Sequence, residues 1–377
     1  MINMTGDMKV TPWEVSGDID YDKLMKEFGT QPLTDALIKR IEKEAGESHF
    51  MLRRRVFFSH RELDVLLKEH DEGKPWALYT GRGPSGKTHL GHMLPWIFTK
   101  YLQDAFKVHL YFQITDDEKF LCKPELTLEQ TNNLAYDNTL DLIALGFNPK
   151  LTHIIVDTDY AKPLYKIALQ VAKRVTTSSA KAAFGFTNET NIGMMFWPAM
   201  QAAPCFLPSV IEGRSVRTLI PAAIDQDPYW RIVRDVAPKL GYPKTAAVHC
   251  IFLPALEGPG KMSTSTGEHS TIFTNDTPEQ VKHKIMKYAF SGGRGSVQEH
   301  REKGGVPEVD VSYQWLRIMF EPDDKKLKAI YDDYVSGKML TGELKQILVY
   351  KINKFLENHQ KEREKAKNHI DKFILRD

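Results

Sequence analysis

Five short runs rich in β-branched and aromatic residues alternate with helical stretches through the middle of the chain. They are WALYT (76–80), VHLYFQIT (108–115), HIIVDTD (153–159), TLIPAAID (218–225) and VHCIFLPAL (248–256). Strands separated by helices are typical of a parallel sheet with helices on both faces. The pattern therefore predicts an α/β fold with a doubly wound parallel sheet. In such sheets, ligands bind beyond the carboxyl ends of the strands.

The regions before and after this α/β segment have a helical pattern. Up to about residue 75, segments such as YDKLMKEFG and LTDALIKRIEKEAG place apolar residues at helical spacing and end at glycine. After Thr266 the pattern is helical again, and Thr277 followed by Pro278 is a favourable helix start. The chain has 377 residues, more than a single domain of ~100–200 residues. We expect three parts: a helical extension over 1–75, an α/β domain over 76–266 and an all-helical domain over 267–377.

Charge and cysteine content narrow the functional class. The net charge is +2, so overall basicity does not indicate a nucleic-acid partner, and any such contact depends on local patches. The three cysteines are scattered and form no C-x-x-C pair, which predicts reduced thiols in an intracellular protein without a zinc site. No apolar run reaches ~18 residues, and the first residues resemble neither a secretory nor a mitochondrial signal. We expect a cytoplasmic protein that does not enter the membrane.

The stretch GRGPSGKTHLGH, from Gly81 to His92, permits two interpretations. Its first eight residues match the phosphate-loop pattern G-x-x-x-x-G-K-[ST], between a predicted strand and a predicted helix. The chain would then be a nucleoside triphosphatase, with Asp157 at the end of HIIVD holding magnesium. Pro84 counts against this, because it removes one backbone N–H from a loop that must wrap phosphate with N–H groups. The match is also short enough to arise by chance in a glycine-rich loop.

The second interpretation combines His89 and His92 with the distant KMSTS segment, which begins at Lys261. Two imidazoles at i and i+3 project from the same side of a helix's first turn, where the helix dipole and free N–H groups favour anions. Gly91 lies between them and lets a nucleotide approach the backbone closely. Such a pair could also bind a metal or be buried for structural reasons, but no carboxylate or further histidine stands at ligand spacing. The pattern favours phosphate chemistry on a nucleotide.

Several motifs together resemble a known family. HLGH and KMSTS are similar to the two signatures of class I aminoacyl-tRNA synthetases. LYTGRGPS, ITDDEK, PAMQAAP, IPAAIDQDPYWR, VAPKLGYPK, AFSGGR and MLTGELK resemble the eukaryotic-type tryptophanyl-tRNA synthetases, in the same order along the chain. The resemblance runs from about residue 11 to the C-terminus. It implies a Rossmann-like catalytic domain with a dimerisation insertion over 76–266 and a helical anticodon-binding domain over 267–377.

The resemblance implies a tryptophan–tRNA ligase that works in two steps. The carboxylate of L-tryptophan attacks the α-phosphorus of ATP and pyrophosphate leaves; the aminoacyl group then passes to the 2′-hydroxyl of the terminal ribose of tRNA(Trp). It also implies a homodimer, and Mg²⁺ that accompanies ATP and is held mainly by phosphates and water, without a dedicated protein metal site. A tyrosyl-tRNA synthetase is the alternative within the class, and a synthetase-like binding protein without catalysis is the alternative outside the enzymes.

The family motifs also imply a role for individual residues. The expected catalytic residues are His89, His92 and Lys261. The expected ATP-binding residues are Thr80, Gly81, Arg82, Gly83, Asp225, Ser263 and Ser265. The expected tryptophan-binding residues are Tyr79 and Gln113 at the indole N–H, Glu118, Gln201 and Gln226 at the ammonium, and Lys119 at the carboxylate.

Two further expectations concern positive charge. Arg294 in AFSGGR is expected to contact tRNA, because the neighbouring glycines allow a nucleotide backbone to come close. The wider class has K-M-S-K-S, whereas this chain has Thr264 in place of the second lysine. The charge of that lysine must then come from Lys261, the histidines or Lys87.

Overall fold

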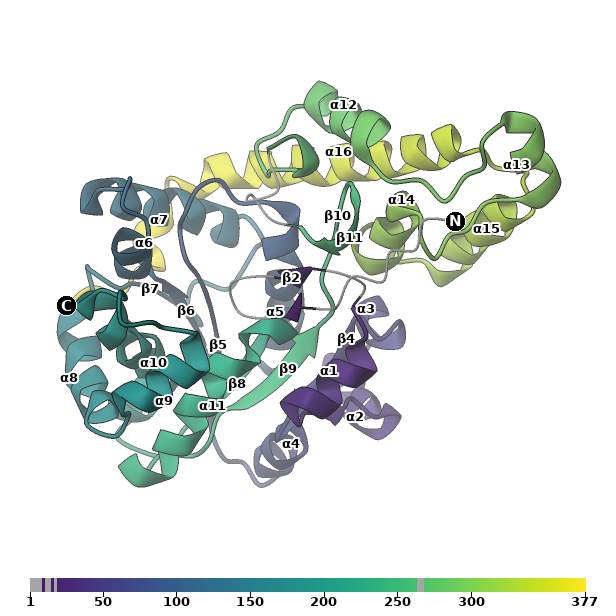
Figure 1. Cartoon of the computed structure of the whole chain (residues 1–377). Coiled ribbons are helices and arrows are strands. Elements are labelled where there is room, and N and C mark those ends of the chain that lie inside the picture. The colour runs from purple at the N-terminus through teal and green to yellow at the C-terminus, as the bar shows by residue number, and fades with distance from the viewer. Residues whose placement is uncertain (1–8, 11–14, 17–18, 263–267) are drawn as a thin grey trace.

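The computed structural model describes residues 9–10, 15–16, 19–262 and 268–377 (Figure 1). Its centre is a seven-stranded sheet with the order β3-β4-β9-β8-β5-β6-β7. These strands are β3 (Gln31–Pro32), β4 (Phe57–Arg61), β5 (Trp76–Arg82), β6 (Leu110–Ile114), β7 (Thr152–Val156), β8 (Arg217–Ala223) and β9 (Ala246–Cys250). Strands β5 to β9 are mutually parallel, and β4 is antiparallel to both β3 and β9. The predicted α/β fold with a parallel sheet is confirmed.

The strand order creates a reversal next to β5. From β5 the chain adds β6 and β7 on one side, then returns to add β8 and β9 on the other side. The loops that leave β5 and β8 therefore diverge, and a crevice opens between them at the carboxyl ends of the strands. The glycine-rich stretch follows β5, and the AIDQD segment follows β8.

Helices cover both faces of the sheet, and the alternation of side chains along β5 connects it to both layers. Leu78 belongs to the apolar core shared with α5 (Leu90–Phe106), whereas Ala77 and Tyr79 belong to the core shared with α10 (Ile192–Glu212). The first layer also contains α2 (Asp35–Ala45), α4 (Leu63–Asp71) and α7 (Leu128–Ile143). The second also contains α8 (Ala161–Ala172), α9 (Thr177–Phe184) and α11 (Asp227–Val236).

Helix α10 is long and apolar enough to cross a membrane by length and composition, although no apolar run of that length is expected from the sequence. It is the only such helix in the described part of the chain. However, 72% of its most apolar window is buried inside the protein, where it packs against α8. It is therefore a core helix of the second layer.

The expectation of a purely helical segment before Trp76 is wrong for the short strands β1 (Lys9–Val10), β2 (Val15–Ser16) and β3, and for residues 57–61. Helices α1 (Tyr21–Phe28), α2, α3 (Phe50–Arg53) and α4 do form there, but Phe57–Arg61 is strand β4. It pairs with β9, as in the pair Ser59 and His249, which are 190 residues apart in the sequence. Tertiary pairing decided the outcome, because a five-residue segment such as FFSHR is too short for its pattern to separate a strand from a helix.

The C-terminal region is mainly helical, as predicted. It contains α12 (Pro278–Tyr288), α13 (Val297–Lys303), α14 (Val311–Trp315), α15 (Asp324–Val335) and α16 (Thr341–Ala366). Thr277 is the N-cap of α12 and accepts a hydrogen bond from the Gln280 main-chain N–H, which confirms the predicted helix start. Helix α16 returns the chain to the sheet (Figure 1), where the Ile154 N–H donates to Phe373 O at 2.7 Å. The last residues thus pair with the edge of β7, so the predicted helical region ends in a short extended segment.

Candidate active site

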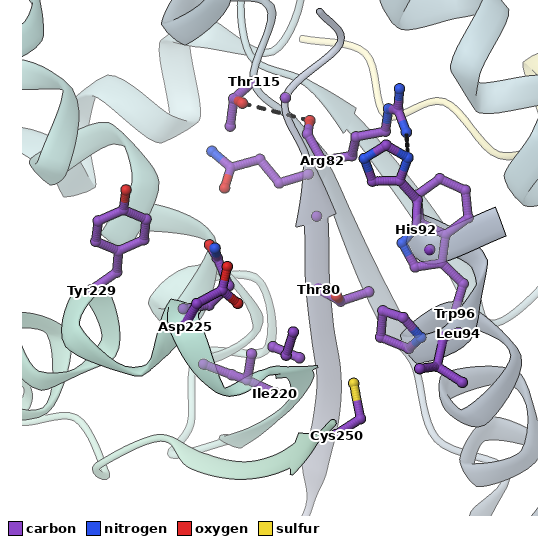
Figure 2. A pocket seen from close by; sticks show the side chains of 18 of the residues that line it. Thr80, Arg82, His92, Leu94, Trp96, Thr115, Ile220, Asp225, Tyr229 and Cys250 are labelled. Carbon is purple, nitrogen blue, oxygen red and sulfur yellow. Dashed lines mark hydrogen bonds between the residues drawn. The ribbon is translucent and has the colours of Figure 1, made fainter. Parts of the chain in front are cut away.

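The crevice beyond β5 and β8 is a cavity of about 300 Å³. In Figure 2, Arg82 and His92 lie on one side of β5, and Asp225 and Tyr229 on the other. The expected catalytic, ATP-binding and tryptophan-binding residues that the structure describes all line this cavity: Tyr79, Thr80, Gly81, Arg82, Gly83, His89, His92, Gln113, Glu118, Lys119, Gln201, Asp225, Gln226 and Lys261. Ser263 and Ser265 lie outside the described residues.

The two histidines begin helix α5. His89 is the N-cap in an extended conformation, and its main-chain N–H donates to Nδ1 of His92 at 3.3 Å. The two ring centroids are 3.5 Å apart with 31° between the ring planes. A Cβ added to Gly91 would lie 3.1 Å from the His89 ring, so a side chain there would displace the ring by a few tenths of an ångström. The arrangement at i and i+3 is thus held by the hydrogen bond to Nδ1 of His92 and by the His92 main-chain N–H, which donates to His89 O at 3.0 Å.

Arg82 determines the tautomer of His92. Its guanidinium contacts Nδ1 of His92 and donates to the main-chain carbonyls of Gly86 and Lys87 at 3.1 Å each. Because a guanidinium can only donate, Nδ1 accepts and the proton of the neutral ring is on Nε2. Burial, together with the charge of Arg82, holds the pKa of His89 and of His92 well below the usual range. At neutral pH the histidines therefore supply hydrogen-bond donors and no positive charge.

Lys261 brings the positive charge from a hairpin. Strands β10 (Pro254–Ala255) and β11 (Gly258–Lys261) form this hairpin, and Nζ of Lys261 lies 2.5 Å from Oδ2 of Asp225. Asp225 is fully buried, and its other oxygen, Oδ1, has no hydrogen-bond partner. An unsatisfied buried carboxylate oxygen is costly unless a ligand donates to it. The carboxylate beside Lys261 is therefore suited to accept from a hydroxyl group of a bound molecule.

Lys87 does not contribute charge to the cavity. It is absent from the cavity lining, and its Nζ lies over the Phe273 ring, 5.8 Å from the ring centroid. A phosphate loop requires this lysine to reach the phosphates. Asp157, which that interpretation assigns to magnesium, is buried and accepts hydrogen bonds from the Gln113 side chain. The geometry thus speaks against a phosphate-loop enzyme.

The opposite wall of the cavity combines flat apolar rings with polar groups. Trp197, Tyr229 and Trp230 line it, and the rings of Tyr79 and Trp230 meet edge to face with centroids 5.5 Å apart. The Tyr79 hydroxyl donates to Oε1 of Gln113 at 2.6 Å. This wall can hold a planar aromatic ring and offer it a polar acceptor.

An ion pair between Glu118 and Lys119 also lines the cavity. Nζ of Lys119 lies 2.8 Å from Oε1 of Glu118, and the Thr115 hydroxyl donates to Oε2 of Glu118 at 2.7 Å. A Cβ on Gly83 would lie 2.0 Å from Cε of Lys119, so residue 83 must be glycine for Lys119 to adopt this position. An adjacent carboxylate and ammonium match the two charges of a free amino acid.

Helix α16 contacts the elements that hold the segment just before His89, and the sequence did not indicate these contacts. Nε2 of His359 lies 2.9 Å from Oδ1 of Asp141 on α7, and Arg363 donates to the same oxygen at 3.2 Å. Gln360 donates to Thr274 O at 2.9 Å, and the Thr274 main-chain N–H donates to Thr88 O at 2.9 Å. These partners are far apart in the sequence, so no local pattern reveals them.

Arg294 lies away from the cavity, in the exposed connection between α12 and α13. This connection is at the end of the helical region remote from β5 (Figure 1). Its Nε donates to Gly304 O at 2.8 Å. The contact of Arg294 with tRNA stays a prediction.

Comparisons with known proteins agree with this geometry. A family model described as tRNA synthetases class I (W and Y) matches residues 71–357. The chain is 54% identical over 372 residues to the tryptophan–tRNA ligase of Sulfurisphaera tokodaii, covering 98% of this chain and 96% of that protein. It is 51% identical over 372 residues to the tryptophan–tRNA ligase of Pyrobaculum calidifontis, covering 99% of each.

Solved structures are similar over the same extent. The tryptophanyl-tRNA synthetase of Plasmodium falciparum has a TM-score of 0.86 at 44% identity, covering 92% of this chain and 94% of that one. The enzyme of Encephalitozoon cuniculi bound to tryptophan has a TM-score of 0.87 at 36% identity, covering 95% of this chain and 98% of that one.

Proposed function

The chain belongs to the class I tRNA synthetases for tryptophan and tyrosine, and we propose that it is a tryptophan–tRNA ligase. It joins L-tryptophan to tRNA(Trp) by way of tryptophanyl-adenylate, at the expense of ATP. The observation that carries the proposal is the convergence of His89, His92 and Lys261 on one cavity whose other wall is aromatic. A binding protein without catalysis has no use for those three groups, and the names of the close relatives favour tryptophan over tyrosine.

ATP binds with its ribose at Asp225 and its phosphates between β5 and the start of α5. The unpartnered Oδ1 of Asp225 supports the ribose contact, because it is a buried acceptor in need of a donor. Gly81 and Gly83 line the cavity, and a Cβ on either residue would collide with Gln113 or Lys119, so glycine keeps the end of β5 close to the substrate-binding side chains. The carboxylates that line the cavity, Glu118 and Asp225, are both paired with lysines, which supports Mg²⁺ held by phosphate oxygens and water. The ion would neutralise charge on those oxygens.

Tryptophan binds against the aromatic wall. The Tyr79 oxygen accepts the indole N–H, Glu118 with Gln201 and Gln226 surrounds the ammonium, and Lys119 meets the carboxylate. The carboxylate oxygen then forms a bond to the α-phosphorus while the bond from that phosphorus to the bridging oxygen of pyrophosphate breaks.

Charge develops on phosphate oxygens during this step. His92 meets it with the Nε2–H donor, and Lys261 meets it with its ammonium. His89 keeps His92 in place through the main-chain hydrogen bond at the helix start. The two histidines and Lys261 act by position and hydrogen bonding, because the step requires no proton transfer to or from the buried imidazoles.

Exposed apolar side chains on α8 and α10 support a homodimer: Tyr165, Leu169, Ile192, Val210 and Ile211. Arg294 and the helical C-terminal region contact tRNA. Three free cysteines support a cytoplasmic location, where thiols stay reduced.

The test is pyrophosphate exchange into ATP by the purified chain. We expect exchange that depends on L-tryptophan and is not supported by L-tyrosine. Exchange with tyrosine alone would assign the chain to the other branch of the family. Absence of exchange with every amino acid, in a folded protein that binds tryptophan, would favour a binding protein.

A further inference from the structure

Gln113 is the centre of a buried chain of hydrogen bonds behind the aromatic wall. Its side-chain amide nitrogen donates to both carboxyl oxygens of Asp157, at 3.0 and 2.8 Å. Its amide oxygen accepts from the Tyr79 hydroxyl at 2.6 Å. Each of the three side chains is 1% exposed, so water does not compete for these bonds.

The direction of each bond follows from the chemistry of the groups. Because the Gln113 nitrogen faces Asp157, its oxygen faces Tyr79, and the Tyr79 hydroxyl hydrogen must point toward an acceptor. The second neighbour of that hydroxyl, Gln201 O at 3.3 Å, is an acceptor too. The Tyr79 oxygen therefore has no hydrogen left to give and can only accept from a third partner. A ring N–H is such a partner.

Asp117 is the partner of Asp157 at the end of this chain of hydrogen bonds. Asp157 and Asp117 are hydrogen-bonded, and burial together with the neighbouring carboxylate raises the pKa of Asp157 well above its usual range. The pKa of Asp117 is raised to about 6, mainly by burial. A proton that Asp157 holds toward Asp117 leaves only acceptor capacity toward Gln113. A rotation of the Gln113 amide by half a turn would then bring two oxygens together.

We propose that Asp157 is a specificity-determining positioning residue: by fixing the orientation of the Gln113 amide, it makes the Tyr79 oxygen a dedicated acceptor for the indole N–H. The inference rests on the proposed function, because it assigns the reading of the substrate's ring nitrogen to that same site. Asp157 itself does not touch the substrate, as it is absent from the cavity lining.

The experiment compares tryptophan with β-(3-benzothienyl)alanine, an analogue of the same shape in which sulfur replaces the ring N–H. The measured quantity is the ratio of kcat/KM for the two amino acids in pyrophosphate exchange. Asp157→Leu removes the acceptor, so Gln113 is free to turn, and we expect the ratio to fall about tenfold to a hundredfold. The loss should reside mainly in KM for tryptophan, with kcat at saturation changed much less.

Two control variants separate orientation from loosening of the fold. Asp157→Asn keeps an acceptor for Gln113 and a donor for Asp117, and should retain the ratio of the unaltered protein within a few-fold. Asp159→Leu removes a carboxylate that contacts Asn132 and Tyr136 instead, and should also leave the ratio unchanged. If Asp157→Leu does not fold, Asp157→Ala provides the same comparison without added atoms.

The outcomes are distinct. A ratio that survives Asp157→Leu and Asp157→Ala, or a ratio near one in the unaltered protein, overturns the inference while leaving the ligase proposal intact. Failure of the unaltered protein to exchange with tryptophan counts against the ligase proposal instead.

Discussion

The two nitrogens of His92 have separate tasks that two substitutions can divide. Nδ1 accepts from Arg82 and from the His89 main-chain N–H, whereas Nε2–H is the donor available to a substrate. In His92→Asn the amide oxygen can replace Nδ1, but nothing replaces Nε2. In His92→Gln the amide nitrogen can replace the Nε2–H donor, but the acceptor at Nδ1 is lost.

The expected magnitudes differ accordingly. Loss of one pre-positioned donor costs about 10²–10³ in kcat, so His92→Asn should slow tryptophan-dependent exchange by that factor while its unfolding free energy stays near that of the unaltered protein. Loss of the cap acceptor costs about 1–2 kcal/mol, so His92→Gln should lower the unfolding free energy by that amount and retain more kcat than His92→Asn. Tryptophan binding, measured by calorimetry, should be similar in both.

The assays are steady-state exchange and urea unfolding on the same protein preparations. Equal kcat losses in the two variants would refute the division of tasks. Unchanged kcat in His92→Asn would refute a donor role for His92 in the chemical step altogether.

Three further predictions follow from other sites. Asp225→Asn removes the charged partner of Lys261 and weakens the acceptor for ribose, so kcat/KM for ATP should fall about tenfold to a hundredfold with little change in KM for tryptophan; a larger effect on tryptophan would contradict the assignment. Asp141→Asn removes the buried negative charge that faces His359 and Arg363 on α16. It should lower the unfolding free energy, measured by urea titration, by about 2–3 kcal/mol. An unchanged unfolding free energy would show that this contact does not stabilise the fold. Burial lowers the pKa of His49 to about 4, so between pH 6.5 and pH 4 the unfolded chain binds a proton at this residue and the folded chain does not. The unfolding free energy of the unaltered protein should therefore fall by about 2 kcal/mol more than that of His49→Asn between pH 7 and pH 5. Parallel curves of unfolding free energy against pH would disprove this prediction.

Much of the site could be predicted because its residues stand in short segments at strand ends. Tyr79 in the middle of β5, Gln113 near the end of β6 and Asp225 after β8 line one cavity because parallel strands bring their carboxyl ends to one edge of the sheet. Lys261 is distant in the sequence, and only the family motif linked it to the histidines. The structure brings it to the same cavity through the β10–β11 hairpin.

Other features had no local signal. Strand β4 depends on its pairing with β9, and the hydrogen bond between His359 and Asp141 joins residues 218 positions apart. The protonation of His92 depends on burial and on the direction of the Arg82 side chain. Lys87 fits a phosphate-loop pattern by sequence, yet its side chain points to Phe273.

The sequence by itself determined the parallel strands and most of the helices, the chemical groups that follow those strands, and the family to which the chain belongs. These depend on periodicity and short motifs, which are properties of neighbouring residues. Only the tertiary structure decided the states of those groups: that the buried histidines are neutral, that Asp157 accepts hydrogen bonds from the Gln113 amide, and that Oδ1 of Asp225 has no hydrogen-bond partner. Burial and the direction of hydrogen bonds set these states, and both arise only when distant segments pack together.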